Sequence, residues 1–167
     1  MWLLAATLML VVNVSWGQNV IISEVMYDSK GSSDEEWIEL YNNTDAAIDI
    51  SGYNITDDDV YPAAGEGDIV IPAGTMLPAR GFLVISWSDL TGITGEIICS
   101  PSSGNRTSAP GLGNSGDNIA LYTSATGGML VDGSLTDRYP DLAPSNEGTS
   151  VERKLGAIGA FGTAGSW

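Results

Sequence analysis

The stretch Glu36-Trp37-Ile38-Glu39-Leu40-Tyr41 decides the fold class, because its apolar and polar residues alternate. In a β-strand, Ile38 and Leu40 would share one face, and the aromatic and acidic residues between them would share the other. One face must then be core, while the opposite face is only partly covered. The polar turn residues 42–45 follow at once. We therefore predict a strand that is buried on one side.

Short runs of the same kind recur along the chain, separated by clusters of Gly, Pro, Asn and Asp. After Gln18, no window keeps the 3.6-residue apolar spacing of an amphipathic helix for three turns. Further strands are predicted over residues 19–27, 47–53, 67–72, 81–87, 118–122, 129–132 and 149–153. About seven or eight strands at this spacing predict an all-β fold, an immunoglobulin-like two-sheet β-sandwich with Greek-key connections.

Three segments carry more specific expectations. Residues 81–87 form the most apolar run after Gln18, which predicts a central strand buried on both faces. Residues 101–116 are rich in Gly, Ser and Pro and predict a long loop. Gly127-Gly128 supplies positive-φ positions and predicts a hairpin turn.

The N-terminus has the layout of a secretory signal peptide. Residues 1–14 are almost entirely apolar, and Ser15-Trp16-Gly17 places small residues before Gln18. About 13 apolar residues are too few to cross a bilayer, which requires roughly 20. We predict a signal peptide over residues 1–17, one domain over residues 18–167, and no membrane span after signal removal. The expected location is secreted, either extracellular or at the cell surface, with the periplasm as an alternative.

Composition excludes several classes of function. The formal charge of −15 opposes nucleic-acid binding, because phosphate backbones are bound by Lys and Arg. Histidine is absent, which excludes Ser-His-Asp triads, Cys-His pairs and histidine metal ligands. The single Cys99 cannot form an intramolecular disulfide and is expected to be buried, with a reactive or intermolecular thiol as the alternative. We predict no catalytic residue and no bound cofactor; a paired-carboxylate glycosidase would have to use residues such as Glu24, Glu36 and Glu39.

The run Asp57-Asp58-Asp59 is the best candidate for a metal site. Calcium binds several carboxylate and carbonyl oxygens supplied by flexible loops. The run lacks the spaced Asp-x-Asp-x-Asp-Gly pattern, so an acidic, solvated loop is the alternative interpretation.

The aromatic residues suit either a sandwich core or a platform for sugars. We expect Trp37 and Trp87 to lie in the core. Tyr61 and Tyr139 each precede a proline, so we expect both in extended loops, where exposed rings would suit a glycan or peptide ligand.

Several of these blocks, taken together, resemble a lamin tail domain. They are residues 21–27, 36–42 and 48–53, then Leu112-Gly113-Asn114-Ser115-Gly116-Asp117-Asn118 leading into residues 119–122, and finally Ser150-Val151-Glu152-Arg153. The resemblance implies an immunoglobulin-like sandwich, and in bacteria such domains occur on exported proteins, often beside hydrolases. The nuclear roles of eukaryotic lamin tails are not carried over, because this chain is acidic and has the signal-peptide pattern.

The sequence therefore predicts an exported, non-enzymatic binding or structural module. Its loops over residues 57–66 and 100–116 would face an unknown protein or glycan partner at a cell surface or in a matrix. One alternative is an accessory domain of a larger secreted hydrolase, of the nuclease, phosphatase or glycosidase type, with its active site elsewhere. A carboxylate enzyme that acts alone is a third alternative.

Overall fold

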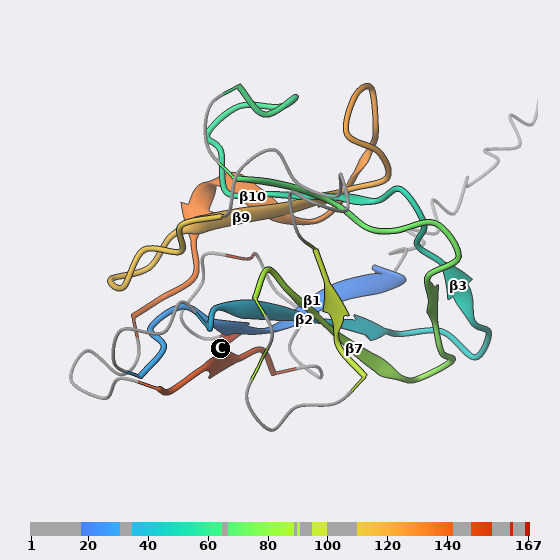
Figure 1. The fold of residues 1–167 in the computed structure, drawn as a ribbon, viewed down its shortest axis with the longest axis horizontal. Helices are drawn as coiled ribbons and strands as arrows, with labels where there is room; N and C mark the ends of the chain where they lie inside the picture. The colour runs from blue at the N-terminus through green and yellow to red at the C-terminus, as the bar shows by residue number, and fades with distance from the viewer. Residues whose placement is uncertain are drawn as a thin grey trace, which may run out of the picture.

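The computed structural model describes residues 18–30, 35–64, 67–88, 90, 95–99, 110–141, 148–154, 161 and 166–167. Regular structure within these ranges is almost entirely strand (Figure 1). The strands are β1 (Val20–Met26), β2 (Trp37–Asn42), β3 (Ile48–Asp49), β4 (Asn54–Thr56), β5 (Asp68–Val70), β6 (Met76–Leu77), β7 (Phe82–Ser86), β8 (Ile97–Ile98), β9 (Asn118–Tyr122), β10 (Leu130–Arg138) and β11 (Val151–Glu152). In this part of the chain, no helix has the length and apolar character needed to cross a membrane.

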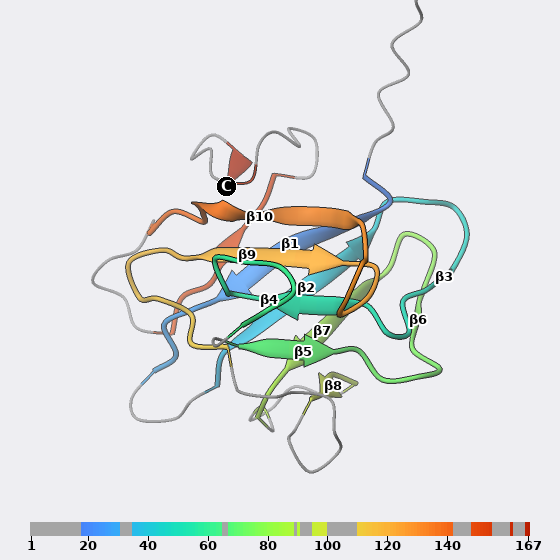
Figure 2. The same ribbon diagram turned by 90° about the horizontal axis from the view of Figure 1, so that it is seen from above.

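The strands form two main sheets that pack face to face. One sheet has the order β11-β1-β2-β7-β8, and the other has the order β10-β9-β4-β5. β3 and β6 form a separate antiparallel pair. Figure 2 shows β9 and β4 of the second sheet lying over β1 and β2 of the first. The chain passes from one sheet to the other several times, which confirms the predicted immunoglobulin-like sandwich.

The core lies between the two sheets, as the alternation in residues 36–41 predicts. Ile38 and Leu40 on β2 are fully buried, whereas the residues that alternate with them are only partly covered. Every residue of β9 is buried. Both sheets contribute aliphatic side chains to this core, including Ile22, Val25, Ile55, Ile69, Ile85, Ile119 and Leu121. Each such side chain contributes about 1.5–3 kcal/mol when it is removed from water.

Two expectations about buried positions are wrong. The strand predicted over residues 81–87 is β7, but Phe82 is 50% exposed, so the strand is not buried on both faces. The Phe82 ring lies on the outer face of its sheet against Tyr41, with ring centroids 4.7 Å apart. Trp37 shares this outer face and is partly exposed, because it alternates with the core residues of β2. Trp87 is buried, as predicted.

The strand predicted over residues 47–53 is interrupted by a turn. Ile48–Asp49 forms β3, and Gly52 then adopts a φ of 76°, which L residues rarely do. The chain continues into β4 in the other main sheet. The strand predicted over residues 129–132 is the first part of the longer β10. Most of the loop predicted over residues 101–116, up to residue 109, lies outside the described residues.

A buried ion pair closes the edge of the sandwich where β1 faces β10 and β11. Arg153 Nη1 lies 2.6 Å from Asp132 Oδ2, and the two side chains are 2% and 1% exposed. The amide of Ile22 donates to Asp132 Oδ2 at 2.7 Å, and Arg153 Nη1 donates to the Ile22 carbonyl at 3.3 Å. The register of β1 against β2 shifts immediately after Ile22. The rings of Phe161 and Trp167 lie 5.6 and 5.7 Å from the guanidinium carbon.

Three glutamates lie opposite one another on neighbouring strands. Glu24 on β1 pairs with Glu39 on β2 and with Glu152 on β11. Glu39 accepts a hydrogen bond from the hydroxyl of Ser23 at 2.8 Å. Burial raises the pKa of Glu39 above its ordinary value of 4.5, and the charges of Glu24 and Glu152 add to the increase. Like charges directly opposite each other destabilise a sheet.

We expect Glu39→Gln to raise the free energy of unfolding at pH 7 by about 0.5 kcal/mol, because it removes this repulsion. A folded-state pKa above the unfolded value means that the charged carboxylate destabilises the fold at neutral pH. This penalty disappears as the pH falls below 4.5, so the benefit of the substitution should disappear there too. Urea unfolding at pH 7 and pH 4 measures both values. A benefit that is equal at the two pH values would contradict the explanation.

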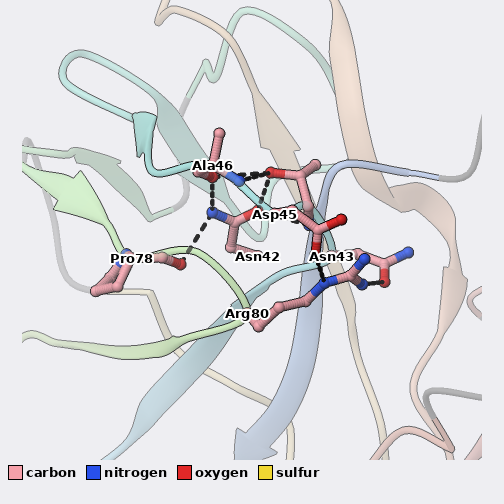
Figure 3. Close-up of polar contacts among 7 residues, drawn as sticks. Asn42, Asn43, Asp45, Ala46, Pro78 and Arg80 are labelled. Atoms are coloured by element: carbon pink, nitrogen blue, oxygen red, sulfur yellow. Dashed lines mark hydrogen bonds and ion pairs between the residues drawn. The ribbon is translucent and has the colours of Figure 1, made fainter.

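Asn42, at the end of β2, connects two segments of backbone (Figure 3). Its fully buried side chain places Nδ2 at 2.8 Å from the carbonyl of Ala46, 3.1 Å from that of Leu77 and 2.9 Å from that of Pro78. Its Oδ1 accepts hydrogen bonds from the amide and hydroxyl of Thr44, at 2.9 and 2.8 Å. Asn42 therefore holds the loop after β2 against the segment that joins β6 to β7.

Asn42→Ala should lower the free energy of unfolding by about 2 kcal/mol, because buried carbonyl and amide groups lose their partner. The matched control is Asn43→Ala at the adjacent position, where the side-chain oxygen accepts an exposed hydrogen bond from Arg80 (Figure 3). We expect the control to leave stability nearly unchanged. Equal losses in the two variants, measured by denaturant unfolding, would show that Asn42 has no special structural role.

Candidate functional site

The two loops that the sequence assigns to partner binding meet at one end of the sandwich. The Gly111 amide donates to Asp57 Oδ2 at 2.7 Å, although 54 positions separate the residues. Asn118 Nδ2 donates to the carbonyls of Asp57 and Asp58, at 2.9 and 3.2 Å. Gly67 packs so closely on Pro110 that a Cβ atom on Gly67 would overlap the proline backbone. The segments that follow β4 and precede β9 therefore form one unit.

Three successive amides in this unit each bind a different carboxylate. Gly111 donates to Asp57, Leu112 donates to Glu36 Oε2 at 3.2 Å, and Gly113 donates to Asp117 Oδ2 at 2.9 Å. Hydrogen bonds to ionised carboxylates are about twice as strong as neutral ones. We call the set Glu36, Asp57, Gly67, residues 110–113 and Asp117 the loop junction.

A buried tyrosine supports the loop junction from the core side. Tyr139 is fully buried, and its hydroxyl donates to the Gly113 carbonyl at 3.2 Å. Its ring lies 5.2 Å from that of Tyr27, whose hydroxyl donates to Asp141 at 3.0 Å. Burial raises the pKa of Tyr139 far above its ordinary value, and the nearby Asp117 carboxylate adds to the increase. The expectation of an exposed Tyr139 is therefore wrong, because distant segments pack around its ring.

The acidic run predicted as a calcium site is split between two environments. Asp57 and Asp58 are 5% and 6% exposed, whereas Asp59 is exposed. Asp58 accepts hydrogen bonds from the amides of Val60 and Ala64, at 3.0 and 2.7 Å. Burial raises the pKa of Asp57, and the Gly111 amide opposes this increase. Within the described ranges, no three His, Cys, Asp or Glu residues are grouped to hold a metal ion, so calcium binding by the run stays a prediction.

The three carboxylates named for glycoside hydrolysis do not share one set of contacts. Glu24 and Glu39 pair across neighbouring strands on the outer face of the five-stranded sheet. Glu36 instead binds the Leu112 amide in the loop junction. Cys99 is fully buried, which confirms the expectation of a packed thiol.

A second set of contacts fixes the far part of the loop over residues 57–64. The Tyr61 ring stacks on that of Tyr122, with centroids 3.6 Å apart and an interplanar angle of 5°. The Tyr61 hydroxyl donates to the Ser124 carbonyl at 2.6 Å and accepts from the Gly128 amide at 2.7 Å. We call these four residues the Tyr61 clamp. Figures 1 and 2 show both clamped loops over the outer face of the four-stranded sheet.

The clamp explains why Tyr61 is partly buried, whereas the sequence predicts an exposed recognition ring. Sequence reasoning also missed three exposed apolar residues beside the clamp, Val60, Met129 and Leu130. A signal exists for two of them, because Val60 follows Asp59 and Met129 follows Gly128 in turn-rich segments, where a core residue is not expected.

Tyr61→Phe should lower the free energy of unfolding by about 1–2 kcal/mol, because two hydrogen bonds of the hydroxyl are lost. Hydrogen exchange at the Gly128 amide should become faster, since this amide loses its acceptor. Tyr53→Phe is the control, because its hydroxyl lies outside the clamp. Unchanged exchange at Gly128 in the Tyr61 variant would show that the clamp does not hold the turn.

The family model of the Lamin Tail Domain matches residues 13–139, which is more than half of the chain. This range includes β1 to β10, the loop junction and the Tyr61 clamp. No curated protein and no solved structure gives a significant match to the chain. The extent of the family match and the two-sheet sandwich agree, and the chain belongs to the lamin tail domain family.

Proposed function

We propose that the protein is an exported, non-catalytic binding module that contacts its partner through the loops over residues 57–64 and 123–130. The observation that carries this proposal is that the first loop is anchored both at its base and at its tip. The loop junction binds its base through Asp57, and the Tyr61 clamp binds its tip to the turn between β9 and β10. A loop surface ordered before binding loses less conformational entropy when a partner docks.

The chemistry of the loops supports binding rather than catalysis. Asp57, Glu36 and Asp117 each accept a hydrogen bond from a backbone amide, so these carboxylates have a structural role. The chain has no histidine to act as a general base near neutral pH. The immunoglobulin-like family to which the chain belongs is also generally non-catalytic.

Site-specific photocrosslinking tests the binding surface. A photoreactive phenylalanine analogue would replace Thr126, which is exposed in the turn between β9 and β10, and the protein would be added to intact cells of its source. The control places the same group at Ala47, which is exposed in the loop after β2. We expect a discrete adduct from position 126 and none from position 47. Equal labelling from both positions, or none from either, would refute the assigned surface.

Export is tested separately by the intact mass of the native polypeptide in the extracellular or surface fraction. The signal-peptide pattern predicts a mature N-terminus at Gln18. A polypeptide found inside the cell with Met1 retained would refute export, whatever the crosslinking experiment shows.

A further inference from the structure

Apolar side chains are concentrated at the Tyr61 clamp. The exposed large hydrophobic residues of the described chain are Val60, Met76, Phe82, Ile98, Met129 and Leu130, and three of these six adjoin the clamp. Val60 is 48% exposed, Met129 is 74% exposed and Leu130 is 53% exposed. Contiguous exposed apolar surface on a soluble protein is typical of an interaction site.

The Tyr61 clamp connects the backbone segments that carry these three residues. Val60 is bonded to Tyr61, and Met129 follows Gly128, whose amide donates to the Tyr61 hydroxyl at 2.7 Å. Leu130 begins β10 and pairs with Tyr122, the residue on which the Tyr61 ring stacks. All three apolar residues are therefore connected, directly or through one neighbouring residue, to the stacked pair of Tyr61 and Tyr122.

The charges near these residues indicate the kind of partner. The exposed charge of the loop over residues 57–64 is the carboxylate of Asp59, and this loop has no basic residue. Residues 123–130 carry no charged side chain. The formal charge of −15 disfavours both a second copy of the chain and anionic lipid as the occupant. A protein surface that combines apolar and basic groups complements both features.

We propose that Val60, Met129 and Leu130 form a docking surface for a partner protein whose apolar groove is bordered by Lys or Arg. This inference rests on the proposed function, because it assigns a partner class to the same loop surface. The apolar side chains supply most of the buried area, and Asp59 at the rim selects basic partners and speeds their association.

Three short synthetic peptides serve as probes in an NMR titration of the purified protein. One alternates Leu with Lys, the second alternates Ser with Lys, and the third alternates Leu with Glu. We expect the Leu/Lys peptide to bind at least about tenfold more tightly than the other two, with shifts centred on the amides of residues 60 and 128–130. Equal binding of the Ser/Lys peptide would overturn the proposal, since general charge attraction would then suffice.

Variants locate the binding. Met129→Ser combined with Leu130→Ser should reduce Leu/Lys affinity to the level of the Ser/Lys peptide. Met76→Ser, a change at a methionine on β6 that is 51% exposed, should leave the affinity unchanged. Unchanged affinity in the double variant would overturn the proposal. Two other results would also overturn it. One is concentration-dependent dimerisation that the double variant abolishes, and the other is binding to phosphatidylcholine and phosphatidylglycerol vesicles that the double variant abolishes.

The photocrosslinking experiment separates this inference from the proposed function. An adduct from position 126 with a partner that lacks a basic surface would leave the proposed function intact and refute the partner class. Absence of an adduct, together with failure of the Leu/Lys peptide to bind, would refute both.

Discussion

Arg153→Met is expected to lower the free energy of unfolding by about 3–5 kcal/mol, because it leaves the buried Asp132 carboxylate without its cation. The Ile22 carbonyl loses a donor at the same time. Equilibrium unfolding in urea gives the value directly. The control is Arg80→Met, which breaks the exposed pair between Arg80 and Asp45 at 2.9 Å. Solvent screens that pair, so the control should show no measurable loss of stability.

The loss in Arg153→Met should depend on pH. Burial already raises the pKa of Asp132, and removal of the guanidinium should raise it further. At pH 7 the charged, buried carboxylate therefore lowers the free energy of unfolding of the variant. As the pH falls, Asp132 becomes protonated in the folded state and this destabilisation decreases. We expect the difference between variant and wild type to be smaller at pH 4 than at pH 7. A difference that grows toward acid pH would contradict this account.

A double variant tests whether the ion pair also stabilises the backbone of β1 through its hydrogen bonds with Ile22. Replacing a buried ion pair by apolar residues is often neutral in other proteins. Here, Arg153→Met with Asp132→Leu would still leave the Ile22 amide and carbonyl without their partners. We therefore expect the double variant to recover only part of the stability lost in the single variant, because two buried backbone groups remain unsatisfied.

The parts of the fold that the sequence predicts are those governed by local alternation. Residues 36–42 form β2 as expected, because each side chain of a strand faces the side opposite to its neighbour. Residues 118–122 form β9 after the Gly-rich turn, and Gly116 has the positive φ that such a turn requires. The motif that carries the family resemblance thus contains a turn and a strand that the sequence predicts locally.

The parts that the sequence does not predict depend on contacts between distant segments. Tyr139 precedes a proline, which suggested an exposed loop, yet Tyr27 and Trp167 pack on its ring. Arg153 looks like a surface residue, but its partner Asp132 is buried on another strand. In the same way, no local pattern shows that the amides of Gly111 and Leu112 bind the carboxylates of Asp57 and Glu36, which lie 54 and 76 positions away.

Gly67→Ala is expected to disrupt the loop junction and to lower the free energy of unfolding by about 3 kcal/mol. A Cβ atom at this position would overlap the Cα of Pro110 and lie 2.7 Å from Asp57 Oδ1. Both obstacles belong to the junction itself, so the two loops must separate to admit the methyl group. The Gly111 amide would then lose its bond to Asp57 and exchange faster with solvent.

Gly111→Ala is the matched control, because a Cβ atom there would meet nothing within 4 Å. We expect it to leave both stability and amide exchange nearly unchanged. The two variants also connect the junction to binding. If the anchored loop presents the docking surface, Gly67→Ala should lower the affinity for the Leu/Lys peptide and the yield of the crosslinked adduct from position 126. Gly111→Ala should change neither quantity. Full binding by a destabilised Gly67→Ala protein would show that the junction stabilises the fold without organising the surface.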